Sequence, residues 1–235
     1  LCGGFAIPVA QTFGAKEYSL MRRYVVNASV LAAGISIAIA VVTALFCRQI
    51  LILIRTPENI LDGAYLYLVI IFIGIPFTVL YNLAAGILRS LGDSKSPFLF
   101  LAISTVINVI GDLVCILVFG MGVEGAAIST IVAQAISGIC CVLYMKKRFA
   151  ILKLERQEEK LSSHRMKILL SMGVPMGLQY SITAIGSVIL QSAVNTLGST
   201  VVAAFTAGMK VKQFTMAPYD ALSNTSATFC GQNLG

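Results

Sequence analysis

Charge is scarce in this sequence, tryptophan is absent, and there is a single histidine. Only 11% of the 235 residues are charged, against roughly 25% in an ordinary soluble domain, whereas 57% are hydrophobic. A soluble protein of this size could bury a large core, but it would still need a polar surface to cover that core. The chain has too few polar residues for such a surface, which predicts a membrane protein.

The missing residue types also exclude most enzymatic classes. The only histidine, His164, lies in a polar segment, and the sequence contains no H-E-x-x-H, G-x-S-x-G, P-loop or C-x-x-C pattern. One isolated imidazole cannot supply a nucleophile together with its base. The six cysteines follow neither a zinc-site nor a disulfide spacing. We therefore expect a protein that is not an enzyme and that needs no cofactor.

Long apolar runs dominate what is present. Six of them are close to or above spanning length: 24–47, 63–88, 98–119, 123–145, 167–195 and 200–232. Their length and continuity are typical of helices, because barrel strands need only about 10 residues of alternating polarity. An earlier stretch, LCGGFAIPVAQTF, is shorter than the roughly 20 residues of a full span, and we interpret it as the end of a longer helix. The sequence predicts an all-α integral membrane protein, a polytopic helical bundle with about six full spans and one partial span.

The few basic residues are distributed very unevenly between the two sides of this bundle. Thirteen of the 17 Lys and Arg residues lie in the alternate segments 14–23, 89–97 and 146–167, whereas the loops of the opposite side hold only Arg48 and Arg55. By the positive-inside rule, we expect these three segments to be cytoplasmic and the protein to be multi-pass in the cell's plasma membrane. The basic excess therefore reflects topology, and we expect no nucleic-acid partner. The long polar segment 146–167, where bases and glutamates mix, is predicted to be a linker between two bundles.

Asp112 is the clearest case of a charged side chain inside an apolar run. A charged side chain near the bilayer centre costs about 2.5–3.5 kcal/mol on insertion scales, so Asp112 within 98–119 requires an explanation. Ser104, Asn108, Asp112 and Cys115 recur at helical spacing and form one polar stripe. The stripe is interpreted either as a proton or cation site that faces an internal cavity, or as polar packing against a neighbouring helix.

Other polar residues and two prolines also interrupt the predicted spans. As candidates for a substrate cavity we name Gln179, Tyr180, Gln191, Asn195 and Lys210. Amides of this kind also cross-link helices, so a packing role for them stays open. Pro76 and Pro175 are expected to kink their spans, either as hinges that gate a cavity or simply as bends in the bundle.

Several of these stretches together resemble the MATE family of multidrug and toxic compound extrusion transporters. The most specific are GILRSLGDSKSPF (86–98), NVIGDLVCILVFGMGVEGAAISTIVAQ (108–134) and GVPMGLQYSITAIGSVILQSAVNTLGS (173–199). A further similarity joins PVAQTFGA (8–15) to TFCGQNLG (228–235), which resemble the equivalent helix ends of the family's two halves.

The resemblance implies part of a two-lobe, twelve-helix transporter fold. Residues 1–150 would form the N-terminal lobe from the end of helix 2 to helix 6, 146–167 the cytoplasmic linker between lobes, and 168–235 the first two helices of the C-terminal lobe. The resemblance also implies a cation-coupling site at Asn108, Asp112 and Thr130, with Na⁺ at Asp112 as the one metal ion expected. A second aspartate of the family's site belongs to helix 1, outside this sequence, and Gln179 stands where some relatives carry an acid.

The function that the resemblance implies is secondary active antiport. The protein would export small organic compounds, cationic or amphiphilic, in exchange for H⁺ or Na⁺ by alternating access, and we expect a monomer in contact with membrane lipid. One alternative is a flippase for a lipid-linked oligosaccharide, which should have a cavity lined by several arginines. The other alternative is a structural membrane protein without transport, in which the polar stripe serves packing alone.

Overall fold

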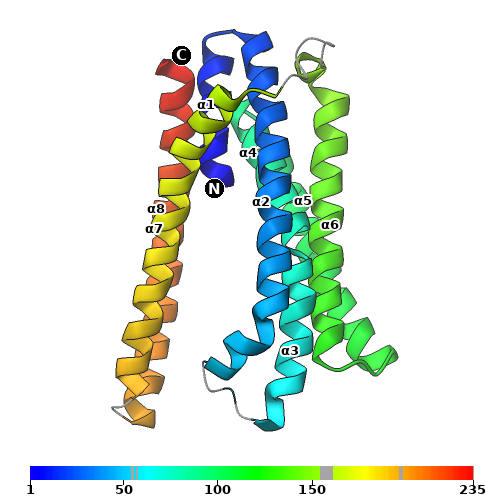
Figure 1. The fold of residues 1–235 in the computed structure, drawn as a ribbon, viewed down its shortest axis with the longest axis vertical. Coiled ribbons are helices and arrows are strands. Elements are labelled where there is room, and N and C mark those ends of the chain that lie inside the picture. The colour runs from blue at the N-terminus through cyan, green and yellow to red at the C-terminus, as the bar shows by residue number, and fades with distance from the viewer. Residues whose placement is uncertain (54–55, 57, 154–160, 196–197, 235) are drawn as a thin grey trace.

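The chain folds into a bundle of long helices (Figure 1). The structure is a computed structural model that describes residues 1–235 except 54–55, 57, 154–160, 196–197 and 235. The α-helices are α1 (Cys2–Gly14), α2 (Tyr18–Leu53), α3 (Glu58–Ile73), α4 (Ile75–Ser90), α5 (Lys95–Leu113), α6 (Val123–Arg148), α7 (Ser163–Asn195) and α8 (Ser199–Leu234). A π-helical segment, η1 (Val114–Val118), extends α5, and a 3₁₀ turn, η2 (Ala150–Leu152), follows α6. No strand occurs among the described residues, so the predicted all-α class is confirmed.

Most of these helices are long and apolar enough to cross a membrane. They are α2, α5 with η1, α6 and α7, and the bent pair α3 and α4 makes a fifth span within the described residues. The sixth predicted segment, 200–232, forms the 36-residue helix α8, but α8 does not reach the same hydropathy. Lys210, Lys212, Asp220 and many Ser, Thr and Asn residues lower it. The chain is a multi-pass membrane protein.

The described residues of the three basic segments lie at one end of the bundle, which we call the basic end (top of Figure 1). The Arg22 side chain donates a hydrogen bond to the Ile151 carbonyl (3.0 Å), and the Ser162 backbone N–H donates to Asn27 Oδ1 (2.9 Å). These two bonds join the first turns of α2 to the segment between α6 and α7. The alternation of helix directions therefore agrees with the topology predicted from the basic residues.

Proline breaks the predicted span 63–88 into two helices. α3 ends at Ile73 and α4 begins at Ile75, so Pro76 is in the first turn of α4, and the two helices meet at 40°. Proline is tolerated in a first turn because it has no backbone N–H to donate there. The kink expected at Pro76 is present, whereas α7 remains helical through Pro175. A hinge motion at either proline stays a prediction.

The sequence GILRSLGDSKSPF contains the turn between α4 and α5. Gly92 has φ +87°, in the left-handed region that glycine adopts most readily, and it ends α4. Asp93 then caps α5, because its Oδ1 accepts the Ser96 backbone N–H (3.0 Å) and its Oδ2 accepts the Ser96 hydroxyl (2.7 Å). The charged residues of this stretch thus lie between two spans, and one of them, Asp93, stabilises the start of α5.

Removing the Asp93 cap should destabilise the start of α5. We expect Asp93→Ala to lower the free energy of unfolding by about 1 kcal/mol, measured by denaturant titration of the purified protein in mixed micelles. Ser94→Ala is the control, because the Ser94 side chain makes no capping hydrogen bond. An equal loss in both variants would contradict the assignment of the cap to Asp93.

The same cap should depend on pH. Partial desolvation raises the pKa of Asp93, but hydrogen bonds from Ser96 and Tyr144 outweigh this and leave the pKa below its ordinary value. A carboxylate with a lowered folded-state pKa stabilises the protein above its unfolded pKa of about 3.9. That contribution is lost as the pH falls through the folded pKa, so the stability difference between wild type and Asp93→Ala should shrink below about pH 4.

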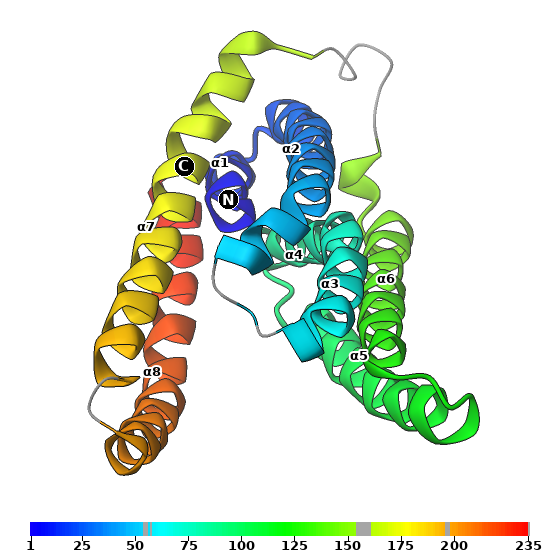
Figure 2. The same cartoon turned by 60° about the horizontal axis from the view of Figure 1, so that its bottom comes forward.

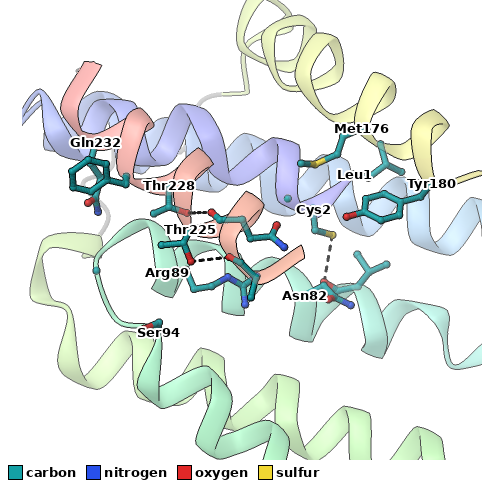
Figure 3. Close-up of a pocket in the computed structure, with 16 residues that line it drawn as sticks. Leu1, Cys2, Asn82, Arg89, Ser94, Met176, Tyr180, Thr225, Thr228 and Gln232 are labelled. Atoms are coloured by element: carbon teal, nitrogen blue, oxygen red, sulfur yellow. Dashed lines mark hydrogen bonds between the residues drawn. The ribbon is translucent and has the colours of Figure 1, made fainter. Parts of the chain in front are cut away.

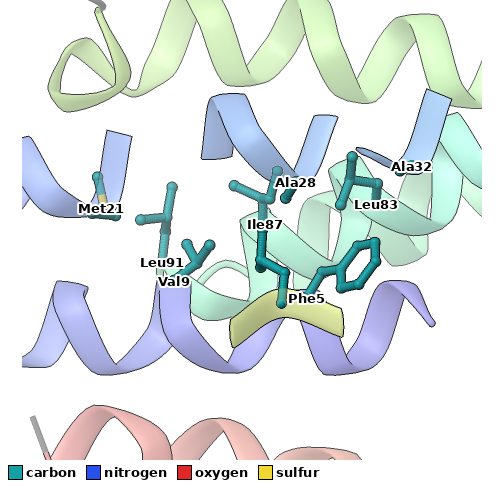
Figure 4. Close-up of a cluster of buried hydrophobic side chains, with 9 residues drawn as sticks. Phe5, Val9, Met21, Ala28, Ala32, Leu83, Ile87 and Leu91 are labelled. Carbon is teal, nitrogen blue, oxygen red and sulfur yellow. The ribbon is translucent and has the colours of Figure 1, made fainter. Parts of the chain in front are cut away.

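A cluster of buried apolar side chains joins α1, α2, α4 and α7 near the basic end (Figure 4). Its members are Phe5, Val9, Met21, Ala28, Ala32, Leu83, Ile87, Leu91 and Leu169. In Figures 1 and 2, α1 lies between the rest of the bundle and the pair α7 and α8, and this pair diverges from the other helices away from the basic end.

The division into residues 1–150, the linker 146–167 and residues 168–235 stays a prediction.

Candidate functional site

The polar stripe of α5 faces α6. The hydroxyl of Ser104 is buried and donates a hydrogen bond to the Ala133 carbonyl (2.6 Å) across the two helices. Close to Asp112, Gly111 leaves room for Ser129, because a Cβ on Gly111 would clash with the Ser129 hydroxyl. Small and hydroxyl-bearing residues therefore let the two helices approach closely, as in other membrane-helix pairs.

Asn108 is the centre of a polar cluster within this interface. Its Nδ2 lies 3.4 Å from Asp112 Oδ1, 3.2 Å from Ser129 Oγ and 3.3 Å from Thr130 Oγ1. The Ser129 hydroxyl in turn donates to the Asn108 carbonyl (2.9 Å), and Thr130 donates to the Ala126 carbonyl (2.9 Å). The structure thus brings together the three residues Asn108, Asp112 and Thr130 that the sequence suggested, from two different helices.

Ser129 belongs to the cluster but was not predicted from the sequence. It directly precedes Thr130 on α6 and is buried. A serine beside glycines and alanines in an apolar run carries no distinguishing pattern. Its role follows only from the way α6 turns this residue toward Asn108.

Asp112 is half-buried and has no cationic partner among the described residues; its hydrogen bond is the one from Asn108. From the midpoint of Lys95–Val118 it lies about 8 Å along the helix, on the side away from the basic end. The π-helical segment η1 begins two residues later, and such wide turns often occur at functional sites.

The cluster is chemically suited to a small hard cation or a proton. Three oxygens, from Asp112, Ser129 and Thr130, surround one point that the Asn108 amide nitrogen now occupies. Rotation of the amide by 180° about χ2 would turn its own oxygen toward the same point. Oxygen ligands of this kind are preferred by hard cations, and the carboxylate alone can take up a proton.

A second feature is a cavity of about 800 Å³ between α1, α4, α7 and α8 (Figure 3). Tyr180, one of the five predicted cavity residues, lines it together with Met176 of α7 and Asn82 of α4. Asp112 does not line this cavity, so the polar cluster around Asn108 and the cavity are separate features of the fold. Arg89, at the end of α4, is the only charged residue among the described residues of the lining.

The other four predicted cavity residues lie elsewhere. Gln179 and Lys210 are exposed, and neither lines the 800 Å³ cavity. Gln191 and Asn195 share one face of α7, as their spacing predicts, and the Gln191 amide donates to Asn195 Oδ1 (2.9 Å). The structure therefore does not bring these four residues together with Tyr180.

The cavity is bounded at the basic end by close contact between α1 and α8. Gly14 packs directly on the backbone of Gln232, where a side chain at Gly14 would clash. The Gln232 amide donates to the Ser90 carbonyl (2.8 Å), and the Ser90 hydroxyl donates to the Ala6 carbonyl (2.9 Å). The similar stretches PVAQTFGA and TFCGQNLG thus lie side by side. Together with α4, this contact holds α8 against the helices of residues 1–150.

Comparisons with known proteins agree in sequence and in fold. The family model described as MatE matches residues 1–114. A probable multidrug resistance protein of Bacillus subtilis, YpnP, is 33% identical over 97% of this chain and 51% of its own length. A FAD transporter of Shewanella oneidensis is 27% identical over 100% of this chain and 50% of its own length. The chain spans about half the length of the curated relatives it matches.

Solved structures show the same fold. The crystal structure of MATE in the bent conformation superimposes with a TM-score of 0.88 at 21% identity, over 98% of this chain and 51% of that one. The outward-facing structure of a multidrug resistance MATE family transporter also gives 0.88, at 20% identity and the same coverage. The helical arrangement described above is therefore that of one half of such a structure.

Proposed function

Because this chain belongs to the MATE family, we propose that it forms the ion-coupling part of a secondary active antiporter in the plasma membrane. The antiporter exports small organic compounds, cationic or amphiphilic, in exchange for H⁺ or Na⁺. This is a transport function and not an enzymatic one. The proposed working unit is a monomer surrounded by lipid. Relatives that are named as multidrug export proteins support an organic substrate.

The observation that carries this proposal is the cluster around Asn108. A carboxylate that lies in a membrane-spanning helix without a cationic partner is costly, so it is retained for a function more often than for packing. Its neighbours Ser129 and Thr130 offer oxygens from a second helix. A cation or a proton that binds there contacts residues of both α5 and α6. Its binding free energy therefore depends on the position of α5 relative to α6.

The arrangement of the helices supports alternating access. α1 and α8 are in contact at the basic end, and α7 and α8 diverge from the other helices toward the opposite end (Figure 1). We propose that this arrangement corresponds to a state closed to the cytoplasm. Ion binding at Asp112 drives the exchange only by the difference in its affinity between this state and the one open to the cytoplasm.

The two alternatives are less well supported. A flippase for lipid-linked sugars should present several arginines, whereas Arg89 is the only charged residue among the described residues that line the cavity. A purely structural role does not require a carboxylate at Asp112, because serine or asparagine at that position would pack as well.

Transport by membrane vesicles distinguishes the three possibilities. Everted vesicles that contain the gene product carrying this chain should accumulate ethidium when an outward Na⁺ or H⁺ gradient is imposed, and accumulation should stop when that gradient is dissipated. Ethidium movement that persists without any ion gradient would contradict antiport. If neither ethidium nor an aromatic anion moves, with the protein verified in the membrane, the structural alternative is supported.

A further inference from the structure

The cavity between α1, α4, α7 and α8 has a polarity that the sequence did not indicate. Among the described residues that line it there is no carboxylate, and the guanidinium of Arg89 is the single charged side-chain group. The remaining polar residues of this lining are neutral and comprise Asn82, Ser94, Tyr180 and residues of α8. The surface that these described residues form is thus positively charged, and it offers a simple organic cation no counter-charge.

Arg89 is free to bind a ligand. It is exposed, and it makes neither a hydrogen bond nor an ion pair with any residue that the structure describes. It also lines a smaller pocket next to the large one, together with Asn224 and Thr228 of α8. Figure 3 shows Arg89 across from Thr225 and Thr228, so its guanidinium lies between the two parts of the bundle.

The rest of the lining is suited to an apolar body. Leu1, Val79, Met176 and Phe229 provide aliphatic, thioether and aromatic surface, and Tyr180 adds an aromatic ring. Apolar surface on part of the wall, together with one charged group, fixes the orientation of an amphiphilic ligand. A guanidinium pairs best with planar or tetrahedral oxyanions, because its parallel N–H groups donate two hydrogen bonds at once.

We infer that this cavity takes an aromatic or aliphatic compound that carries an oxyanion, a carboxylate, phosphate or sulfonate, and that Arg89 is the residue that selects it. This inference rests on the proposed transport function and narrows its substrate class from cationic or amphiphilic compounds to anionic amphiphiles. Arg89 is more than a topological anchor, since Lys95 in the same turn carries the same charge at the basic end but does not line the cavity.

The test compares two fluorescent probes in vesicles containing the full gene product: carboxyfluorescein, an aromatic anion, and ethidium, an aromatic cation. We expect the wild type to transport carboxyfluorescein, and Arg89→Gln to lower the ratio of carboxyfluorescein to ethidium transport at least tenfold at subsaturating concentrations. The loss of a charge-assisted hydrogen bond typically has an effect of this size or larger. Arg89→Lys, which keeps the charge without the planar fork, should give an intermediate ratio.

Lys95→Gln is the matched control and should leave both transport rates unchanged. Transport of ethidium but not of carboxyfluorescein by the wild type would overturn the inference and leave antiport standing. A wild-type ratio in Arg89→Gln, or the same ratio in Arg89→Gln and Lys95→Gln, would overturn it as well. If neither probe moves while the protein is present in the membrane, the transport function itself fails, and the inference fails with it.

Discussion

Asp112→Asn should abolish ion-coupled transport and leave the protein folded. The amide keeps the size of the side chain and can still bond to Asn108, but it cannot bind a proton at neutral pH and offers a cation no charge. We expect substrate accumulation in everted vesicles to fall to the level of membranes without the protein. Thermal unfolding in detergent should stay close to the wild-type midpoint.

The matched control for this variant is Asp62→Asn. Asp62 is an exposed carboxylate on α3, away from the cluster, so its loss removes the same charge without touching the α5–α6 interface. We expect Asp62→Asn to transport at the wild-type rate. Undiminished transport in Asp112→Asn would remove Asp112 from the mechanism, and equal loss in both variants would indicate a general effect of charge.

Gly14→Leu should hold the basic end open. Gly14 packs on the Gln232 backbone with no space for a Cβ, and overpacking of this kind costs about 1–3 kcal/mol. That cost falls only on the state in which α1 and α8 touch, so the equilibrium shifts toward the state open to the cytoplasm. We expect transport to fall about tenfold or more, since each 1.36 kcal/mol corresponds to a factor of ten.

Spin labels can measure this opening directly. With the native cysteines replaced, labels at Lys95→Cys and Asn233→Cys report the distance between the α4–α5 turn and the end of α8, which are both exposed. Gly14→Leu should shift that distance distribution to larger values. Gly34→Leu on α2 is the control, because a side chain there meets nothing within 4 Å. An unchanged distribution in Gly14→Leu would show that the contact does not close the basic end.

Hydropathy and charge predicted the architecture well for a physical reason. In lipid each span must satisfy its backbone hydrogen bonds within its own helix. The position of a span can therefore be predicted from a short local stretch of apolar residues. The basic loops follow the same logic, because the positive-inside rule acts on each loop separately. The bend at Pro76 was likewise predictable from the missing N–H of one residue.

The members of the polar cluster around Asn108 were predicted only in part. The spacing of Asn108 and Asp112 places them on one face of α5, and the family resemblance added Thr130. Ser129 was missed, because which residue of α6 meets Asn108 depends on the rotation of α6 about its axis. Of the candidate cavity residues, Tyr180 lines the cavity, whereas Gln191 and Asn195 bond to each other instead.

Arg89 illustrates the limit of reading charge along the chain. In the sequence it is one of thirteen basic residues that mark the cytoplasmic side, indistinguishable from Lys95. Its position in the cavity depends on α8, whose contacting residues lie more than a hundred positions later. The role of a polar side chain between helices therefore depends on which helices pack against it, and sequence periodicity does not predict that packing.

Ion-coupled substrate exchange in proteoliposomes tests the central claim most directly. Purified protein should be reconstituted with substrate inside, and the uptake of ²²Na⁺ and of protons should be followed as the substrate leaves. We predict that the wild type takes up one of these two ions in fixed proportion to the substrate released, and that Asp112→Asn takes up neither. Ion uptake of the same proportion in Asp112→Asn would contradict the coupling role of the α5–α6 cluster.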